Sequence, residues 1–179
     1  FTKQVNARQP SSMQEFRLTD TAGNVKWFSF LSTLTIKDGQ VVGQSGVAQD
    51  ITERKQAEES LQQAEKKYRT IFENAVEAIH QTTVDGKYIT ANPATARILG
   101  YDSPEELMVS VNDLNARFYV EPGRREEFKR LIETHERISN FESEVYRKDG
   151  STIWVSENVH TVRDHDGTLL FYEGTSLDI

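Results

Sequence analysis

Histidines and paired glutamates are the residues of this sequence that could do acid–base or metal chemistry, but their spacing does not bring them together. The four histidines stand at positions 80, 135, 160 and 165, each in a different expected element. None forms the i, i+4 pair that binds a metal on a helix. The pairs Glu105-Glu106 and Glu126-Glu127 stand at expected helix starts, where carboxylates complement the helix dipole. We find no catalytic constellation and predict that this chain is not itself an enzyme.

The composition is that of a globular, acidic chain. Of 179 residues, 28 are Asp or Glu and 21 are Lys or Arg, and the net charge of −7 argues against nucleic acid as a partner. No apolar run approaches the roughly 20 residues that cross a bilayer, so we expect no membrane contact and a cytoplasmic location. The absence of cysteine excludes disulfides, thiolate nucleophiles and iron–sulfur clusters. Because the chain starts at Phe1 rather than Met, we expect it to come from a longer protein.

The sequence contains an internal repeat. A shift of 127 residues, which becomes 128 after one inserted residue, superimposes glycines, tryptophans and Asp-Gly turns in the same order. The matched pairs include Phe1 and Phe128, Val5 and Ile132, Glu15 and Glu142, Gly23 and Gly150, Trp27 and Trp154, Gly46 and Gly174, and Asp50-Ile51 and Asp178-Ile179. We therefore predict the second half of one module, followed by one whole module.

The first module is expected to end in three antiparallel strands. Turn residues between β-branched and aromatic runs predict the end of a helix over 1–9 and strands over 15–21, 25–36 and 41–49. Without helices to cover it, one face of this sheet would expose apolar residues, which are either Phe28, Phe30 and Leu34 or Trp27 and Leu31. We predict that a second chain covers this face, giving a homodimer.

A helix is expected between the modules, over 52–75. Asp50 is predicted as its N-cap, with Glu53 three residues later as the reciprocal capping residue. Small and apolar residues recur at alternating spacings of four and three, namely Ala57, Leu61, Ala64, Tyr68, Ile71 and Ala75. This period of about 3.5 residues is typical of a helix that packs against a parallel partner helix in a coiled coil. The alternative is a solvated amphipathic linker.

The second module combines two strands, several helices and three more strands. The expected elements are strands over 78–83 and 87–91, a helix capped by Asn92 and ended by Gly100, a helix starting at Ser103-Pro104, a helix over 124–138, and strands over 141–147, 152–163 and 168–177. The stretch 111–119 is expected to be irregular or to contain short helical turns. This order predicts an α+β fold, with a five-stranded antiparallel sheet and its helices on one face.

Several motifs of these elements resemble the PAS family and its C-terminal PAC half. They are 68–75 (YRTIFENA), 85–94 (DGKYITANPA), 98–101 (ILGY), 147–151 (RKDGS) with Trp154, and the junction 50–55 (DITERK). The resemblance covers the end of a first PAS domain over 1–51, a connecting signalling helix over 52–75 and a complete second domain over 68–179. It implies a sensory and dimerisation module of a bacterial signalling protein, such as a sensor histidine kinase of a two-component system or a nucleotide cyclase.

The resemblance also bears on cofactors. PAS domains that form a light-driven flavin adduct use a cysteine, which this chain lacks. Haem-binding relatives use a histidine on the long helix before the last three strands, where Glu127 stands at the expected place and His135 lies near the helix end. We therefore expect no cofactor and no metal.

The helices and the sheet would enclose a core or a cavity. Its expected lining is Ile79, Ile89, Ala96, Leu99, Phe118, Leu131, Ile132 and Val155, with Asn92 and Tyr119 as polar contacts. If these residues pack solidly, they are only the core, because apolar periodicity usually marks burial. The predicted function is a non-catalytic signal-input and relay module, in which the connecting helix residues from Asp50 to Ile71 transmit the signal. The alternative is a receptor for an unknown small molecule in the cavity.

Overall fold

The structure is a computed structural model of the chain and describes residues 11–111, 114 and 118–179. The helix end expected over 1–9 lies outside these residues. The chain forms two compact units, residues 1–66 and 67–179. Within the described ranges, no helix is long and apolar enough to cross a membrane.

The first unit contains a three-stranded antiparallel sheet of order β1-β2-β3. Its strands are β1 (Ser11–Thr19), β2 (Val25–Lys37) and β3 (Gln40–Asp50). All three expected strands are present, and β1 begins four residues earlier than the sequence predicted. Asp38 and Gly39 have φ values of 52° and 76°, the left-handed conformation that a tight hairpin turn requires.

Helix α1 (Thr52–Asn74) follows β3 almost without a loop. The prediction of Asp50 as N-cap is wrong by one residue, because Asp50 still pairs with Phe28 in the sheet. The first helical hydrogen bond runs from the Lys55 amide to the Ile51 carbonyl at 3.0 Å, which makes Ile51 the cap. The Asp50 carboxylate instead accepts hydrogen bonds from the amide and the hydroxyl of Thr52, at 2.9 and 2.6 Å.

The first turn of α1 is anchored to the β1–β2 face that carries Trp27. Arg54 and Lys55 form ion pairs with the two carboxylate oxygens of Glu15, at 2.6 and 2.7 Å. The Lys55 ammonium lies 5.4 Å from the centre of the Trp27 ring, and the Trp27 amide donates to the Thr52 hydroxyl at 2.9 Å. These contacts fix the direction in which the helix leaves this sheet.

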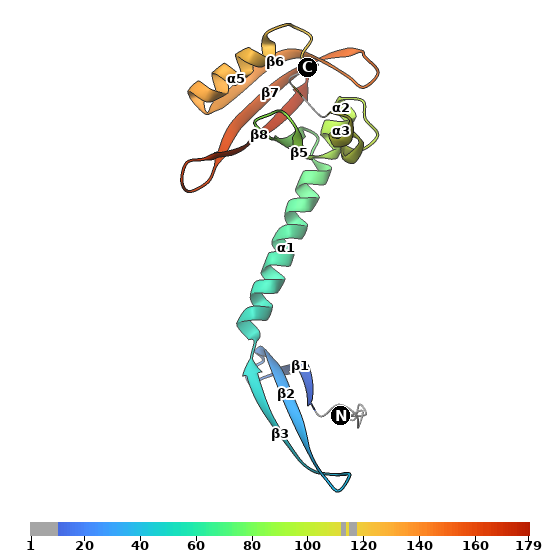
Figure 1. Ribbon diagram of the computed structural model, residues 1–179, viewed down its shortest axis with the longest axis vertical. Helices are drawn as coiled ribbons and strands as arrows, with labels where there is room; N and C mark the ends of the chain where they lie inside the picture. The colour runs from blue at the N-terminus through green and yellow to red at the C-terminus, as the bar shows by residue number, and fades with distance from the viewer. Residues whose placement is uncertain (1–10, 112–113, 115–117) are drawn as a thin grey trace. The chain divides into compact units, whose positions relative to one another are not determined.

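The second unit contains a five-stranded antiparallel sheet of order β5-β4-β8-β7-β6 (Figure 1). Its strands are β4 (Ala78–Thr82), β5 (Tyr88–Ala91), β6 (Arg137–Tyr146), β7 (Thr152–Arg163) and β8 (Leu169–Asp178). Its helices are α2 (Pro93–Ile98), α3 (Pro104–Ser110) and α5 (Arg124–His135).

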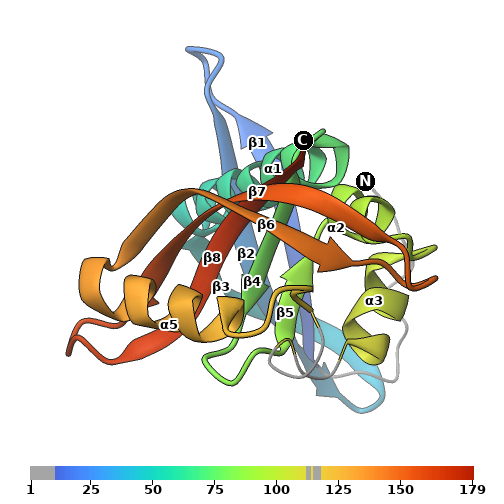
Figure 2. The same cartoon turned by 90° about the horizontal axis from the view of Figure 1, so that it is seen from above.

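The helices of the second unit cover one face of this sheet (Figure 2). Side chains alternate along β7, so Val155 and Val159 point to the same face. Val159 packs below α5 with Phe128, Ile132, Ile138, Phe141 and Tyr172. Val155 packs below α2 and α3 with Ala91, Leu99, Leu107 and Val145. The predicted α+β class and five-stranded sheet are therefore confirmed.

Helix termini in the second unit follow their sequence signals, with two exceptions. The side chain of Ser103 accepts from the Glu106 amide at 3.1 Å, but the Glu106 carboxylate accepts from the Asp102 amide and not from Ser103. Helix α5 ends at His135, three residues earlier than predicted, because Glu136 adopts a left-handed φ of 58° and turns the chain into β6. Ile138 consequently lies in the strand.

The Asn92 side chain connects α1, β4 and α2. Its oxygen accepts from the amides of Ile79 and Thr95 at 3.0 and 2.9 Å. Its nitrogen donates to the carbonyls of Phe72 and Glu77 at 3.1 and 2.9 Å. The Asn92 side chain is fully buried and satisfies all four of these backbone groups.

Replacing Asn92 by Ala should lower the free energy of unfolding by about 3 kcal/mol, because four backbone groups lose their hydrogen-bond partner at once. Ser103→Ala is the matched control, since it removes one cap hydrogen bond and should cost about 1 kcal/mol. Urea denaturation of both variants measures the difference. Equal costs would show that Asn92 acts only as a helix cap.

Candidate functional site

The interior of the second unit holds two small cavities of about 20 Å³ each. Both are lined by His80, Tyr88 and Phe118. A volume of this size admits about one water molecule. Around these two cavities, the described side chains of the helices and the sheet pack closely about a polar centre.

A buried carboxylate lies at this centre. Glu157 projects from the middle of β7 and is 5% exposed. Its Oε2 accepts a hydrogen bond from the Tyr119 hydroxyl at 2.9 Å. Burial raises the pKa of Glu157 to about 7, although the Tyr119 hydrogen bond and the charges of Arg125 and Arg124 oppose the rise. Arg125, on the first turn of α5, is 6% exposed and stacks over the ring of Phe128.

His80 is the second buried ionisable group of the centre. Its Nδ1 atom has no hydrogen-bond partner, and burial lowers its pKa to about 4, so the imidazole is neutral at pH 7. The ring packs edge-on against Tyr88, whose pKa is raised by burial. Gly174 makes room for the ring, because a Cβ there would lie 3.1 Å from His80 Nε2 and 2.9 Å from Val159.

The predicted lining residues separate into three groups. Leu99, Phe118 and Val155 line one small cavity, and Phe118 and Tyr119 line the other. Leu131 and Ile132 pack in the core below α5. Ala96 is buried beside a surface hollow next to α2.

Ile79, Ile89 and Asn92 do not line the interior, contrary to the prediction. Strand β4 buries Ala78, His80 and Thr82, so Ile79 faces the opposite side of the sheet. Ile89 is exposed, because the alternation in β5 directs Tyr88 inward. The Asn92 amide is fully engaged with backbone groups.

His80 and Glu157 were not assigned to the interior from the sequence, although both are buried ionisable residues of this centre. Alternation along Val155, Glu157 and Val159 was the available signal, because it places the glutamate on the same face as two buried valines.

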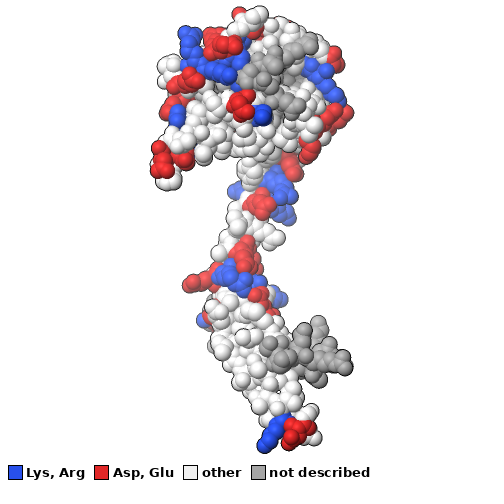
Figure 3. Space-filling model, in the orientation of Figure 1, with Lys and Arg blue, Asp and Glu red and all other residues white. Residues whose placement is uncertain are grey.

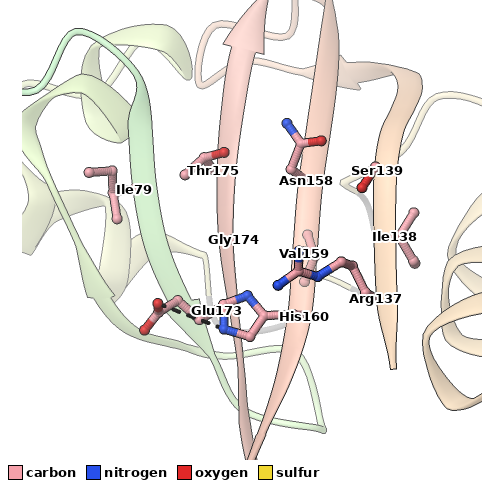
Figure 4. Close-up of a pocket in the computed structure, with 10 residues that line it drawn as sticks. All are labelled: Ile79, Arg137, Ile138, Ser139, Asn158, Val159, His160, Glu173, Gly174 and Thr175. Carbon is pink, nitrogen blue, oxygen red and sulfur yellow. Dashed lines mark ion pairs between the residues drawn. The ribbon is translucent and has the colours of Figure 1, made fainter. Parts of the chain in front are cut away.

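The opposite face of the sheet is open and carries a groove of about 340 Å³. Figure 4 shows its lining, which is Ile79, Arg137, Ile138, Ser139, Asn158, Val159, His160, Glu173, Gly174 and Thr175. His160 Nε2 lies 3.9 Å from the Glu173 carboxylate, which also accepts a hydrogen bond from Gln81 at 2.8 Å. The groove thus carries the apolar side chain of Ile79 beside groups of both charge signs, Arg137 and Glu173.

The apolar seam of α1 is exposed within the single chain. Leu61, Tyr68 and Ile71 are 71%, 61% and 60% exposed, and no residue of α1 is buried. Ala75 lies just beyond the helix, which ends at Asn74. Figure 3 shows acidic and basic side chains interspersed along the helix.

The first sheet also exposes apolar side chains. Met13, Leu31 and Val47 are exposed and directly opposite one another across the three strands, on the face of Trp27. On the other face, Phe28 and Phe30 are half-buried. Among the described residues of the chain, no group of three His, Asp or Glu side chains could hold a metal ion.

The five-stranded antiparallel sheet with short helices on one face is the arrangement found in PAS structures. Residues 76–179 match the family described as PAS domain, and the chain belongs to that family.

Similar proteins include sensor kinases. The chain is 28% identical over 104 residues to the sensor histidine kinase TmoS of Ectopseudomonas mendocina, and 33% identical over 88 residues to sporulation kinase E of Bacillus subtilis. These matches cover 56% and 49% of this chain but only 10% and 11% of the kinases.

A solved structure shows the same fold. The PAS domain of an HTR-like protein from Haloarcula marismortui superimposes with a TM-score of 0.55 at 24% identity, over 70% of this chain and 99% of that domain.

We expect the His80 imidazole to titrate with a midpoint near pH 4, because its charged form is not hydrated in the core. Its pKa lies below the ordinary 6.5, so its contribution to stability is complete above pH 6.5 and is lost as pH falls toward 4. Nitrogen-15 NMR of the imidazole, assigned with His80→Gln, measures the midpoint. A midpoint above 6 would mean that water reaches the ring.

Proposed function

We propose that this chain is a non-catalytic input and relay module of a larger signalling protein, and that it works as a homodimer paired through α1. The family is sensory, and two of the similar proteins are kinases whose names describe sensing or sporulation. The attached output, kinase or other, belongs to the part of the parent protein outside this chain.

The main support for pairing is the exposed seam of α1. Leu61, Tyr68 and Ile71 place large apolar surfaces in water at spacings of seven and three residues. A second copy of the helix, parallel and in register, would bury them in knobs-into-holes packing. The interspersed charges that flank the seam suit the solvated positions of such a pair.

Both ends of α1 are held by the units that it joins, which suits a relay. Glu15 binds Arg54 and Lys55 at the first turn, and Asn92 binds the Phe72 carbonyl in the last turn. A change in one unit would therefore alter the helix pair. Two packings that differ by only a few kcal/mol suffice for a modest input to shift their populations.

The first sheet offers a second contact for the partner chain. The exposed row of Met13, Leu31 and Val47 lies on the sheet face whose Glu15 and Trp27 contact the first turn of α1, so a helix pair would bring apolar surface from two copies into one region. We propose that this unit corresponds to the end of a preceding PAS domain, as its repeat of Trp27 and Trp154 suggests.

A small-molecule receptor is the second candidate function. Its support is the polar centre formed by His80, Tyr119 and Glu157, which could orient a ligand. Cavities of about 20 Å³ would have to expand to admit anything larger than water. Native mass spectrometry, compared with a spectrum under denaturing conditions, tests this candidate. Extra mass on the dimer that disappears on denaturation would indicate a bound ligand. A dimer with the mass of two bare chains would favour the relay function alone.

Leu61→Glu should raise the dimer dissociation constant at least about tenfold, because two carboxylates would meet at the centre of the seam. Gln63→Glu is the matched control, since it adds the same charge away from the seam and should leave the constant within about twofold. Analytical ultracentrifugation at micromolar concentrations measures both.

A wild-type chain that is monomeric at these concentrations would refute pairing through α1. Equal effects of the two substitutions would indicate that another surface holds the dimer.

A further inference from the structure

We propose that Glu157 is a proton-binding site in the core of the second unit, and that its proton controls how firmly Tyr119 and the first turn of α5 are held over the sheet. The proposal deepens the relay function by naming one stimulus, and it rests on that function only for the consequence in the parent protein. The proton-binding step itself is a property of this domain.

The geometry supports a titrating group at this place. Glu157 is almost fully enclosed, yet a cavity of about 20 Å³ adjoins it, so one water molecule could carry a proton to or from the carboxylate. Tyr119 Oη lies 2.9 Å from Oε2 and can donate to a carboxylate or accept from a carboxylic acid. The hydrogen bond therefore survives both protonation states.

Several neighbouring elements contribute to the charge balance of this site. Among the described residues, the ionisable groups around the cavity or acting on Glu157 are His80 from β4, Tyr88 from β5, Tyr119, Arg124 and Arg125 from α5, and Tyr172 from β8. Strand β6 places the apolar Phe141 opposite Glu157 in the sheet. Arg124 also pairs with Glu127 at 2.7 Å, which offsets part of its charge.

The balance disfavours the buried charge. His80 is neutral near pH 7, and the arginine charges and the Tyr119 hydrogen bond do not outweigh burial, so the pKa of Glu157 is raised to about 7. The two arginines and Tyr119 belong to α5 and the segment before it. Proton release thus places a charge directly beneath these two segments.

The direction of the effect follows from linkage. The folded domain holds the Glu157 proton up to about pH 7, whereas a state in which the carboxylate reaches water releases it near 4.5. Opening of α5 and the Tyr119 segment should therefore become more frequent as pH rises from about 4.5 to 7, by up to about tenfold per pH unit, and then level off. His80 acts in the opposite sense on global unfolding between its own two pKa values, so overall stability masks the change and a local measurement is needed.

Infrared spectroscopy of the purified chain tests the site directly. The carbonyl stretching band of a buried carboxylic acid should be present at pH 6 and disappear with a midpoint near 7. Glu157→Gln should abolish this band. Glu126→Gln is the matched control, because it removes an exposed carboxylate from the same turn of α5 as Arg125 and should leave the band unchanged.

Tyr119→Phe keeps the test decisive if Glu157→Gln does not fold. This substitution removes the Tyr119 hydrogen bond, which lowers the pKa of Glu157. The pH at which the carbonyl band disappears should therefore move upward. A band that titrates near 4.5, or one that persists in Glu157→Gln, overturns the proposal.

Amide hydrogen exchange over 118–128 tests the coupling. After correction for the intrinsic pH dependence of exchange, opening should rise toward pH 7 in the wild type and stay constant in Glu157→Gln. If Glu157 titrates near pH 7 but hydrogen exchange does not change with pH, only the coupling to Tyr119 and α5 is refuted. The relay function is tested independently of this proton site, because it is refuted only if the chain does not pair through α1.

Discussion

The second unit depends on one buried amide, that of Asn92. Two backbone donors and two backbone acceptors from three different elements converge on it. A carboxylate could not donate, and a hydroxyl offers only one proton, so the position requires both halves of a primary amide. The same side chain caps α2, aligns β4 and holds the last turn of α1. The domain and the helix that leads into it are therefore joined by hydrogen bonds and not only by the chain.

Much of this fold was predictable, because the chain marks its turns and caps with residues that have few alternatives. Asn92 and Ser103 cap the helices as predicted, and Gly100 adopts the left-handed φ of 78° that its place after α2 requires. The predicted α5 was three residues too long, because Glu136, a residue type that normally favours helix, takes the left-handed conformation there. The end of this helix therefore does not follow local helix preference.

The interior was predicted less well than the elements. Strand β4 mixes polar and apolar residues, so its period-two pattern does not identify the inner face, and Ile79 was assigned to the wrong side. Glu157 escaped notice because glutamates are rarely buried without a partner. Its environment depends on Tyr119 and Arg125, which are distant in sequence and meet it only in the folded domain.

The packed core and the exposed surfaces suggest how such a domain can respond to a signal. The two cavities between the described residues hold about one water molecule each. In the proposed account, the paired seam of α1 and the protonated or ionised polar centre are instead the elements with two states. A proton is small enough to enter without repacking the core. Because α5 and α1 contact the same sheet domain through different residues, a change in the core and a change in pairing can be tested separately.

The most direct test of the central claim, pairing through α1, uses the absence of cysteine from the chain. In a parallel, in-register pair, residues at seam positions approach their counterparts to about 6 Å between Cα atoms, which a disulfide can bridge. Ala64→Cys should therefore give an interchain disulfide under mild oxidation, whereas Gln63→Cys should remain largely monomeric on a non-reducing gel. Equal cross-linking at both positions, or none at position 64, would contradict the account.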